Sequence, residues 1–381
     1  MSVKPKIAIV RGKFLNRYEM QFYEPLVKDF DITAFGSKTS FHDSFSFPII
    51  QLFSPMDITD FPKKMPIINR LYTDAHYLYG LEDKLKGFDL VHTAETYFHY
   101  TQQCLNAKKK NLVKKVIATV LENIPFNNEG IHGRKEFKLR AREELDYIIA
   151  LTERTKLSLL LEGASSEKMK VISHFIDTKR FFPMVKQDAH ADFHRINILF
   201  CGRLEKYKGI YELLFALKLL LKDSELQKFS LMLTFVGDGS EKQSMLEMEK
   251  RLGIERSVTH TNKTYDEMPG VYQNAQVYVA PSKETDTWIE QYNTTLLEAQ
   301  ASGLPIVTTN SGGIPENVGE AGLYVQSGDV YSLVQALKKF ILSSSLRKEY
   351  GMLARNRAER VHDISIGATK IAEVWNTVLY G

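Results

Sequence analysis

The chain has 381 residues, of which 44% are apolar and 25% charged, too many for one compact core. We therefore expect two domains of about 150–200 residues, which excludes a single small binding module. The 50 Lys and Arg residues against 46 Asp and Glu leave a formal charge of only +4, so a dedicated nucleic-acid binder is disfavoured and no nucleic-acid partner is expected.

The cysteines and the apolar stretches indicate the cellular compartment in which the protein is expected. Cys104 and Cys201 lie far apart and have no metal-ligand spacing around them, which argues against a disulfide framework and a structural zinc site. The richest apolar stretch, residues 213–221, is about half the length that spans a bilayer, and residues 1–10 are too polar for a signal peptide. We expect a soluble, cytoplasmic protein.

Short β-branched runs alternate with stretches of helical periodicity along the whole chain. Strands are predicted at residues 6–10, 89–93, 116–121, 147–151 and 170–173, then at 197–200, 231–236, 276–280, 305–309 and 323–325. Such alternation predicts α/β domains with parallel sheets covered by helices on both faces.

The domain boundary is predicted near residues 181–183, where Phe-Phe-Pro precedes a polar stretch. The expected domains are residues 1–183 and 196–364, joined by a linker at 184–195, each a doubly wound Rossmann-like domain facing the other across a cleft. A terminal helix at 365–381 could complete the first domain, because it carries one apolar stripe: Ile371, Val374, Trp375, Val378 and Leu379.

The strongest chemical signal is the sequence Gly202-Arg-Leu-Glu-Lys-Tyr-Lys208-Gly after the strand at 197–200. Gly202 permits a tight turn at the strand end. Arg203 and Lys208 flank the start of the next helix, so two cations and helix N–H donors could bind a diphosphate. The alternative is a solvated turn whose cations face water.

A second signal is a pair of carboxylates spaced by seven residues, Glu290 in a loop and Glu298 inside the following helix. Because a helix rises 1.5 Å per residue, the two carboxylates are far enough apart to accept hydrogen bonds from two different sugars of one ligand. The alternative for each is a capping or surface role. Three N–H groups at the helix start would point at the anion that joins the sugars: Tyr292, Asn293 and Thr294.

These motifs resemble the family 4 retaining glycosyltransferases of GT-B fold (glycosyl transferases group 1). The resemblance covers about residues 197–325 and rests on Gly-Arg-Leu-x-x-x-Lys-Gly, Val236-Gly-Asp-Gly, Pro-Ser with Glu-x7-Glu, Gly-x-Pro-Ile-Val and Ser311-Gly-Gly-Ile-Pro-Glu. The resemblance implies a UDP-, GDP- or ADP-sugar donor held by the second domain, and a glycan or lipid-linked or small-molecule acceptor held by the first.

Matched by position, the resemblance gives each motif residue a role. Arg203 and Lys208 would hold the diphosphate, Glu298 the ribose, and Glu290 the hydroxyls of the transferred sugar. Arg203, Lys208 and Glu290 form the expected catalytic set, and Gly202 and Gly237 are further donor-site candidates. Gly12, at the end of the first predicted strand, could lie close to the transferred sugar or belong to a plain strand-to-helix turn. Cations and helix N–H groups stabilise the charge that develops on a leaving diphosphate. Retention by front-face attack needs no side-chain nucleophile, and we predict no cofactor and no catalytic metal.

The first domain departs from the family pattern. Glu122-Asn123 stands where many members have His-Asp, and Phe175 replaces a usual glycine, which we expect to reshape the cleft beside His174. Glu122, Asn123 and His174 are therefore acceptor-side candidates. His92 and Glu95 follow a predicted strand and are therefore acceptor-side candidates at the cleft rim, or ordinary surface-loop residues.

Several other patterns carry less weight. Lys242 stands where a dinucleotide fingerprint needs its third glycine, which disfavours a Rossmann dehydrogenase. Asp29 and Asp31 form an Asp-x-Asp pattern, but they stand at the start of a predicted strand, far along the chain from the donor motifs. Exposed acids at a strand start explain this pattern better than a metal site. The remaining alternatives are a GT-B phosphorylase or epimerase and a catalytically silent nucleotide-sugar-binding protein.

Two basic clusters occur in the first domain. They are either solvated faces or a peripheral contact with anionic lipid on the inner face of the membrane. Their members are Lys108, Lys109, Lys110, Lys114 and Lys115, and Arg134, Lys135, Lys138, Arg140 and Arg142.

Overall fold

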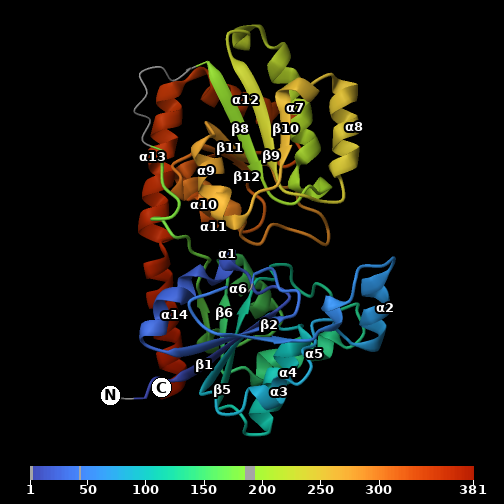
Figure 1. The fold of residues 1–381 in the computed structure, drawn as a ribbon, viewed down its shortest axis with the longest axis vertical. Helices are drawn as coiled ribbons and strands as arrows, with labels where there is room; N and C mark the ends of the chain where they lie inside the picture. Colours follow the sequence, from blue (N-terminus) through green and yellow to red (C-terminus); the bar gives the residue numbers. More distant parts are fainter. Residues whose placement is uncertain (1–2, 43, 185–193) are drawn as a thin grey trace. The chain divides into compact units, whose positions relative to one another are not determined.

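The computed structural model describes residues 3–42, 44–184 and 194–381. It divides into two compact units, the first formed by Met1–Phe175 with Ile364–Gly381 and the second by Ile176–Asp363. Figure 1 shows that each unit has a central sheet with helices around it.

The first unit contains a seven-stranded parallel sheet in the order β3-β2-β1-β4-β5-β6-β7. Its strands are β1 (Lys6–Gly12), β2 (Asp31–Ser37), β3 (Ile49–Leu52), β4 (Leu90–Ala94), β5 (Lys115–Val120), β6 (Tyr147–Ala150) and β7 (Met169–Val171). Its helices are α1 (Arg17–Met20), η1 (Gln21–Lys28), η2 (Pro55–Asp57), α2 (Lys64–Leu71), α3 (Leu81–Lys84), α4 (His99–Lys109), α5 (Arg134–Glu144), α6 (Glu153–Leu161), η3 (Ser166–Lys168) and α14 (Ile364–Tyr380).

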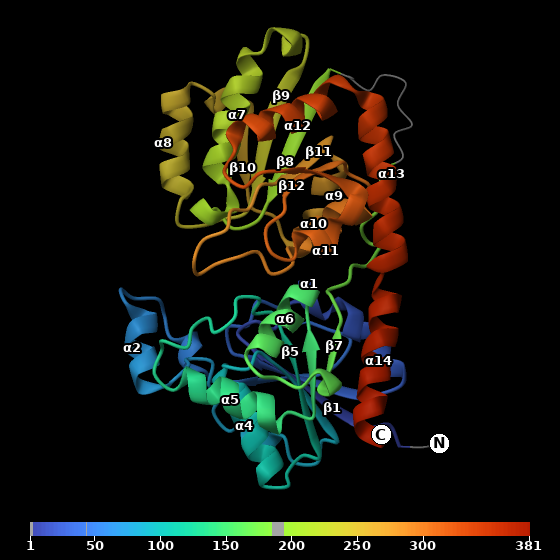
Figure 2. The ribbon, with the colours of Figure 1, turned by 180° about the vertical axis from the view of Figure 1, so that it is seen from behind.

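Both faces of this sheet are buried, because alternate residues of β1 enter different cores. Ala8 and Val10 pack into a core shared with Tyr100 of α4. Ile7 and Ile9 join a second core that includes η1 and an apolar stripe of α14: Ile371, Val374, Trp375 and Val378. Figure 2 shows α14 running alongside this sheet. A parallel sheet needs such cover on both faces, and the chain's last helix supplies part of it.

The second unit contains a six-stranded parallel sheet in the order β10-β9-β8-β11-β12-β13. Its strands are β8 (Arg195–Cys201), β9 (Ser230–Val236), β10 (Val258–Thr261), β11 (Val277–Ala280), β12 (Ile306–Thr309) and β13 (Gly322–Val325). Its helices are η4 (Lys206–Lys208), α7 (Ile210–Lys222), η5 (Ser224–Leu226), α8 (Lys242–Leu252), η6 (Glu255–Ser257), η7 (Tyr265–Glu267), α9 (Met268–Gln273), α10 (Thr294–Ala301), α11 (Ile314–Val318), η8 (Gly319–Ala321), α12 (Val330–Leu342) and α13 (Ser344–Val361).

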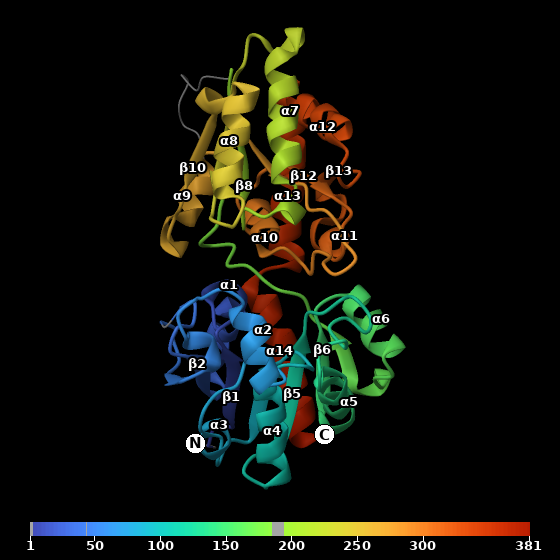
Figure 3. The same ribbon diagram turned by 90° about the vertical axis from the view of Figure 1, so that its right-hand side faces the viewer.

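Neighbouring helices cover this second sheet. α7 packs beside α12, and their buried leucines, among them Leu213 and Leu337, share one core with β8 and β9. α10 packs beside α13, and Figure 3 shows α7 and α12 side by side. Within the described part of the chain, no helix is both long and apolar enough to cross a membrane.

The predicted fold class, two doubly wound Rossmann-like units, is confirmed. The predicted strands correspond to observed strands, whereas β3 and β10 were not predicted. Both are four-residue strands at the edge of a sheet, and most of their residues are partly exposed. An edge strand buries less apolar surface than a central one, so its sequence signal is weaker.

The chain leaves the first unit at Phe175 rather than at residue 183. The next residues already belong to the second unit, because the Ile176 N–H donates to the His362 carbonyl at 2.7 Å and Phe181 is fully buried there against Tyr272. Residues 185–193 of the predicted linker lie outside the described residues, and Arg195 already begins β8.

The expectation that Phe175 reshapes a cleft is wrong. Its ring is fully buried in the core that contains α14. A Cβ added to Gly367 of α14 would lie 2.3 Å from the Phe175 ring, so the glycine leaves room for the aromatic side chain. The replacement therefore fixes the terminal helix to the first unit.

Candidate functional site

In the second unit, the two motifs singled out from the sequence meet where the strand order reverses. β8 and β11 are hydrogen-bonded neighbours at the centre of the sheet, and from them the chain proceeds outwards in opposite directions. The loop that carries Arg203 and Lys208 follows β8, and the loop that carries Glu290 follows β11. Ligands of open α/β sheets bind at such a switch point, beyond the carboxyl ends of the strands.

Glu290 is the centre of a polar network at this switch point. Its Oε2 lies 2.6 Å from the ammonium of Lys208 and also accepts hydrogen bonds from the Ser282 hydroxyl at 2.8 Å and the Asn293 amide at 3.4 Å. The Glu290 side chain is 7% exposed and that of Lys208 is 13% exposed. The network therefore contains a carboxylate and an ammonium that are already paired. It also includes Ser282 of the Pro-Ser motif, a residue to which the sequence alone gave no role.

Two glycines allow close backbone approach around this network. Gly237 has φ +138°, and a Cβ there would lie 2.1 Å from the Gly202 carbonyl oxygen. Gly312 has φ +54°, and a Cβ there would lie 1.9 Å from the Glu290 carbonyl oxygen. Since only glycine fits at these contacts, the turns after β8 and β9 and the loop around Glu290 depend on them.

The start of α10 has an unusual backbone conformation. Asn293 is the N-cap and lies in the left-handed region with φ +61°. Asparagine tolerates this region better than other side chains, so the helix start keeps its shape. Tyr292 is buried, with its carbonyl accepting from the Asn317 amide at 2.6 Å, and Thr294 is the first residue of the helix.

Glu298 lies deeper, inside α10, and is 2% exposed. Its Oε2 accepts a hydrogen bond from the Tyr272 hydroxyl at 2.6 Å. Burial raises the pKa of Glu298 to about 7, although the Tyr272 hydroxyl and the charge of Arg180 both act to lower it. This carboxyl can therefore change its charge near neutral pH, and it lies in the same helix whose start faces the Glu290 network.

Arg203 differs from Lys208 because its side chain is exposed. Its guanidinium carbon lies 5.5 Å from the centre of the Tyr207 ring. An exposed guanidinium remains available to a ligand.

In the first unit, the placement predicted for His92 is wrong. It lies within β4, is fully buried, and is not at a rim. Its Nδ1 accepts from the Trp375 indole N–H at 3.2 Å, so its Nε2 carries the proton and donates to the Thr119 hydroxyl at 2.8 Å. Burial, together with the charge of Arg11, holds the pKa of His92 well below its usual value. It is a neutral core histidine.

Glu95 and Glu122, in contrast, are brought together beyond the ends of β4 and β5. Glu95 is 4% exposed, has φ +58°, and its Oε1 accepts from the backbone N–H groups of Leu121 and Glu122 at 2.9 and 3.2 Å. Burial, reinforced by the nearby Glu122, raises the pKa of Glu95 to about 8. Glu122 accepts from the Asn127 amide at 2.8 Å.

The remaining predicted residues of the first unit are also buried. Asn123 is 1% exposed and His174 is 5% exposed. Burial, with the charge of Arg11, lowers the pKa of His174 to about 3. Gly12 ends β1 with φ +53°, and a Cβ there would lie 3.2 Å from the Tyr100 ring.

Acidic side chains pair with most of the cations of the two basic clusters. Arg134 lies 2.9 Å from the fully buried Asp74, which also accepts from the His76 imidazole, and Lys138 and Arg142 both pair with Glu162. The other pairs are Lys108 and Lys115 with Asp146, Lys110 with Glu82, Lys114 with Asp89, and Arg140 with Glu144. These contacts favour a structural role for most of the clusters' charge.

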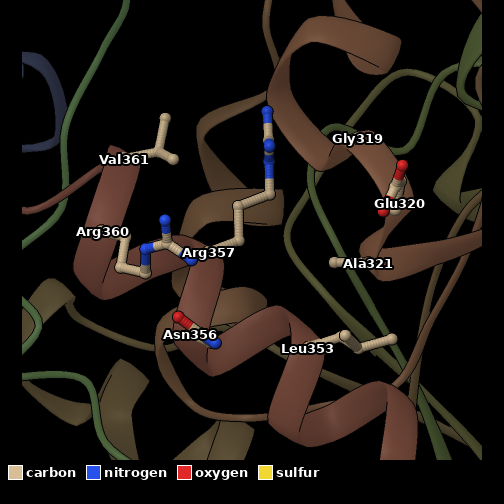
Figure 4. Close-up of a pocket in the computed structure, with 8 residues that line it drawn as sticks. All are labelled: Gly319, Glu320, Ala321, Leu353, Asn356, Arg357, Arg360 and Val361. Carbon is tan, nitrogen blue, oxygen red and sulfur yellow. The ribbon is translucent and has the colours of Figure 1, made fainter.

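One cavity of about 380 Å³ opens between η8 and the C-terminal half of α13 (Figure 4). Arg357 and Arg360 lie on its α13 side, and no predicted site residue lines it. Within the described ranges, no group of three or more His, Cys, Asp or Glu side chains could hold a metal ion.

Comparison with known proteins shows what the second unit is similar to. Residues 195–343 match the family model "Glycosyl transferases group 1". The chain is 29% identical over 233 residues to a D-inositol 3-phosphate glycosyltransferase of Corynebacterium jeikeium, covering 57% of this chain and 54% of that protein. It is 24% identical over 267 residues to the capsular polysaccharide biosynthesis glycosyltransferase CapM of Staphylococcus aureus, covering 66% and 68%. The chain thus spans about half to two thirds of the length of these curated relatives.

Solved structures with the same fold cover nearly the whole chain. A sucrose-phosphate synthase of Thermosynechococcus elongatus superposes with a TM-score of 0.77 at 18% identity over 98% of this chain and 99% of that one. Anabaena Alr3699/HepE, solved in complex with UDP and glucose, gives 0.77 at 16% identity over 98% and 100%. The fold of both units is therefore that of these proteins, and the resemblance inferred from the motifs is confirmed for residues 195–343, which match the glycosyl transferases group 1 model.

Proposed function

We propose that the protein is a retaining glycosyltransferase that moves a hexose-type sugar from a nucleotide-diphosphate sugar to a glycan, a lipid-linked acceptor or a small molecule. The second unit would hold the donor and the first unit the acceptor. The relatives include one glycosyltransferase named for capsular polysaccharide biosynthesis, which supports a role in cell-envelope or surface-glycan synthesis. The free cysteines Cys104 and Cys201 fit a cytoplasmic site of action.

The observation that carries this proposal is the ion pair of Lys208 with Glu290 beside the exposed Arg203 at the switch point. When the glycosidic bond of the donor breaks, negative charge develops on the leaving diphosphate. Cations that are already in place stabilise this charge more than that of the ground state, and so they lower the barrier.

Glu290 would position the transferred sugar rather than attack it. Its Oε2 already accepts from Lys208, Ser282 and Asn293, which suits a group that orients hydroxyls by hydrogen bonds. In front-face transfer the acceptor hydroxyl attacks the anomeric carbon while the diphosphate oxygen leaves and takes up the proton. Analysis of the product's anomeric configuration by NMR tests this, and inversion would contradict it.

The donor is the first property to determine. UDP-glucose is the natural starting ligand, because HepE is also described in complex with UDP-glucose. Thermal-shift measurements with UDP, GDP and ADP would rank the bases, since a ligand at 100 times its Kd adds about 2.7 kcal/mol to folded-state stability.

We further propose that the transfer is metal-independent, with Arg203 and Lys208 supplying the positive charge next to the diphosphate. Activity that is unchanged by EDTA supports this. Loss of activity that returns with added Mg²⁺ or Mn²⁺ contradicts it.

Two alternative functions are separated by product analysis. A silent nucleotide-sugar-binding protein would bind the donor without releasing nucleotide. A GT-B epimerase would convert the donor without an acceptor, and a phosphorylase would require inorganic phosphate. Release of nucleotide diphosphate that depends on an acceptor, with a new glycoside formed, supports the transferase.

A further inference from the structure

Two aromatic rings that the sequence motifs did not single out lie at the switch point of the second unit. Tyr207 belongs to η4 in the loop after β8, and Trp288 belongs to the loop after β11. Their ring centres are 4.1 Å apart with an angle of 38° between the ring planes. The rings therefore join the loop of Arg203 and Lys208 to the loop of Glu290.

Each ring lies against one of the two cations assigned to the donor. The guanidinium carbon of Arg203 is 5.5 Å from the centre of the Tyr207 ring, and the ammonium of Lys208 is 4.8 Å from the centre of the Trp288 ring. Both distances fall within the range of about 6 Å in which a ring face attracts a cation. The four side chains form a continuous series: Arg203, Tyr207, Trp288 and Lys208.

The backbone holds this series in place. The Lys283 N–H, in the loop after β11, donates to the Tyr207 carbonyl at 2.7 Å and so ties the two loops together. Trp288 lies in a tight turn closed by hydrogen bonds to Thr285. Among them, the Thr285 N–H donates to the Trp288 carbonyl at 2.8 Å and the Trp288 N–H donates to the Thr285 hydroxyl at 3.0 Å. Both rings remain partly exposed.

We propose that Tyr207 and Trp288 are positioning residues of the donor site, which hold Arg203 and Lys208 on their ring faces so that both cations are in place before the diphosphate binds. The inference rests on the proposed function of this site. Lysine and arginine have long side chains with many rotamers, and ordering them at the moment of binding costs conformational entropy. A rigid aromatic pair removes part of that cost in advance and keeps the cations oriented during the reaction.

Glu290 pairs with Lys208 at 2.6 Å, whereas the exposed guanidinium of Arg203 lies against the Tyr207 ring. The aromatic pair places the exposed guanidinium and the mostly buried ammonium on two adjoining ring faces.

The test compares Trp288→Leu with Trp288→Phe, using UDP-glucose as the donor. Because leucine has no π face, we expect Trp288→Leu to lower kcat about tenfold, whereas Trp288→Phe stays within about threefold of the wild type. The matched control is Tyr331→Leu, which removes a 70% exposed ring from α12 of the same unit. Thermal midpoints of all variants show that they are folded.

Fluorescence gives a second readout that a merely structural ring would not change. Trp288 and the fully buried Trp375 are the 2 tryptophans of the chain. Binding of UDP should place the negative charge of the diphosphate next to the Lys208 ammonium on the Trp288 ring and so change the emission of Trp288, and this change should be absent in Trp288→Phe.

The outcomes separate the inference from the proposed function. If the wild type neither binds UDP nor releases it from UDP-glucose, while GDP, ADP and their sugars also fail, the proposed function and the inference are both overturned. If the wild type is active but Trp288→Leu matches Tyr331→Leu in kcat, the inference is overturned and the proposed function stands.

Discussion

Lys208 and Glu290, which are 82 residues apart in the chain, form an ion pair with a nitrogen–oxygen distance of 2.6 Å. The pair joins the loops after β8 and β11 and is mostly shielded from water. Lys208 therefore has two tasks, since it stabilises the buried carboxylate and, as proposed, binds the donor diphosphate. The exposed Arg203 has only the second task.

This difference predicts distinct phenotypes for two alanine variants. Arg203→Ala should lower the transfer rate about 10²-fold or more with an unchanged thermal midpoint, because it removes one stabilising charge. Lys208→Ala should lower the rate similarly and also destabilise the second unit by about 3–5 kcal/mol, since it leaves a buried charge without its partner. Initial rates and urea unfolding measure both effects.

Lys206→Ala is the matched control for these variants. Lys206 lies in the same loop, is 71% exposed, and pairs only loosely with Glu241 at 3.6 Å. It should behave like the wild type. Turnover near that of the control in both test variants would contradict the proposed mechanism.

The raised pKa of Glu298 predicts a pH-dependent stability. The group binds its proton up to about pH 7 when folded, but only up to its ordinary value of 4.5 when unfolded. Between these values the folded state holds more protons, so its contribution to stability is full below pH 4.5 and is lost as the pH rises to about 7. Glu298→Gln removes the ionisation and should gain about 3 kcal/mol relative to the wild type at pH 8.

Unfolding of the wild type and of Glu298→Gln should therefore be compared from pH 5 to pH 8. The stability difference should grow with pH, whereas the exposed Glu255→Gln control should show no trend. A difference that is constant across this range would show that Glu298 keeps an ordinary pKa.

His92 should prove structural. His92→Leu removes the acceptor for the Trp375 indole and the donor to Thr119, which leaves buried polar groups unpaired at a cost of about 1–3 kcal/mol. The affinity for UDP, which we assign to the second unit, should not change. The exposed His132→Leu serves as the control, and loss of nucleotide binding in His92→Leu alone would contradict this interpretation.

The ion pairs of the basic clusters predict weak membrane binding. Because most of these cations already face acids, we expect the protein to stay with the dense fraction when floated with anionic vesicles at low salt. Flotation that salt abolishes, and that charge reversal of the exposed Lys109 and Lys135 weakens, would show instead that the clusters bind lipid head groups.

By itself, the sequence determined the fold class and the motifs of the second unit. Alternating β-branched runs and helical stretches are local signals, and buried parallel strands make them strong. The glycines and charged residues after β8 and β11 could be assigned because the carboxyl ends of parallel strands always meet at one sheet edge.

The tertiary structure alone decided what each of these side chains contacts. His92 looked like a rim residue, but Trp375, 283 residues away, buries it. Arg134 looked like part of a lipid-facing cluster, but it pairs with Asp74, 60 residues earlier. No sequence motif singled out the rings of Tyr207 and Trp288. Burial and ion pairing depend on which distant segments pack together, and that packing follows from the strand order, which local sequence patterns do not encode.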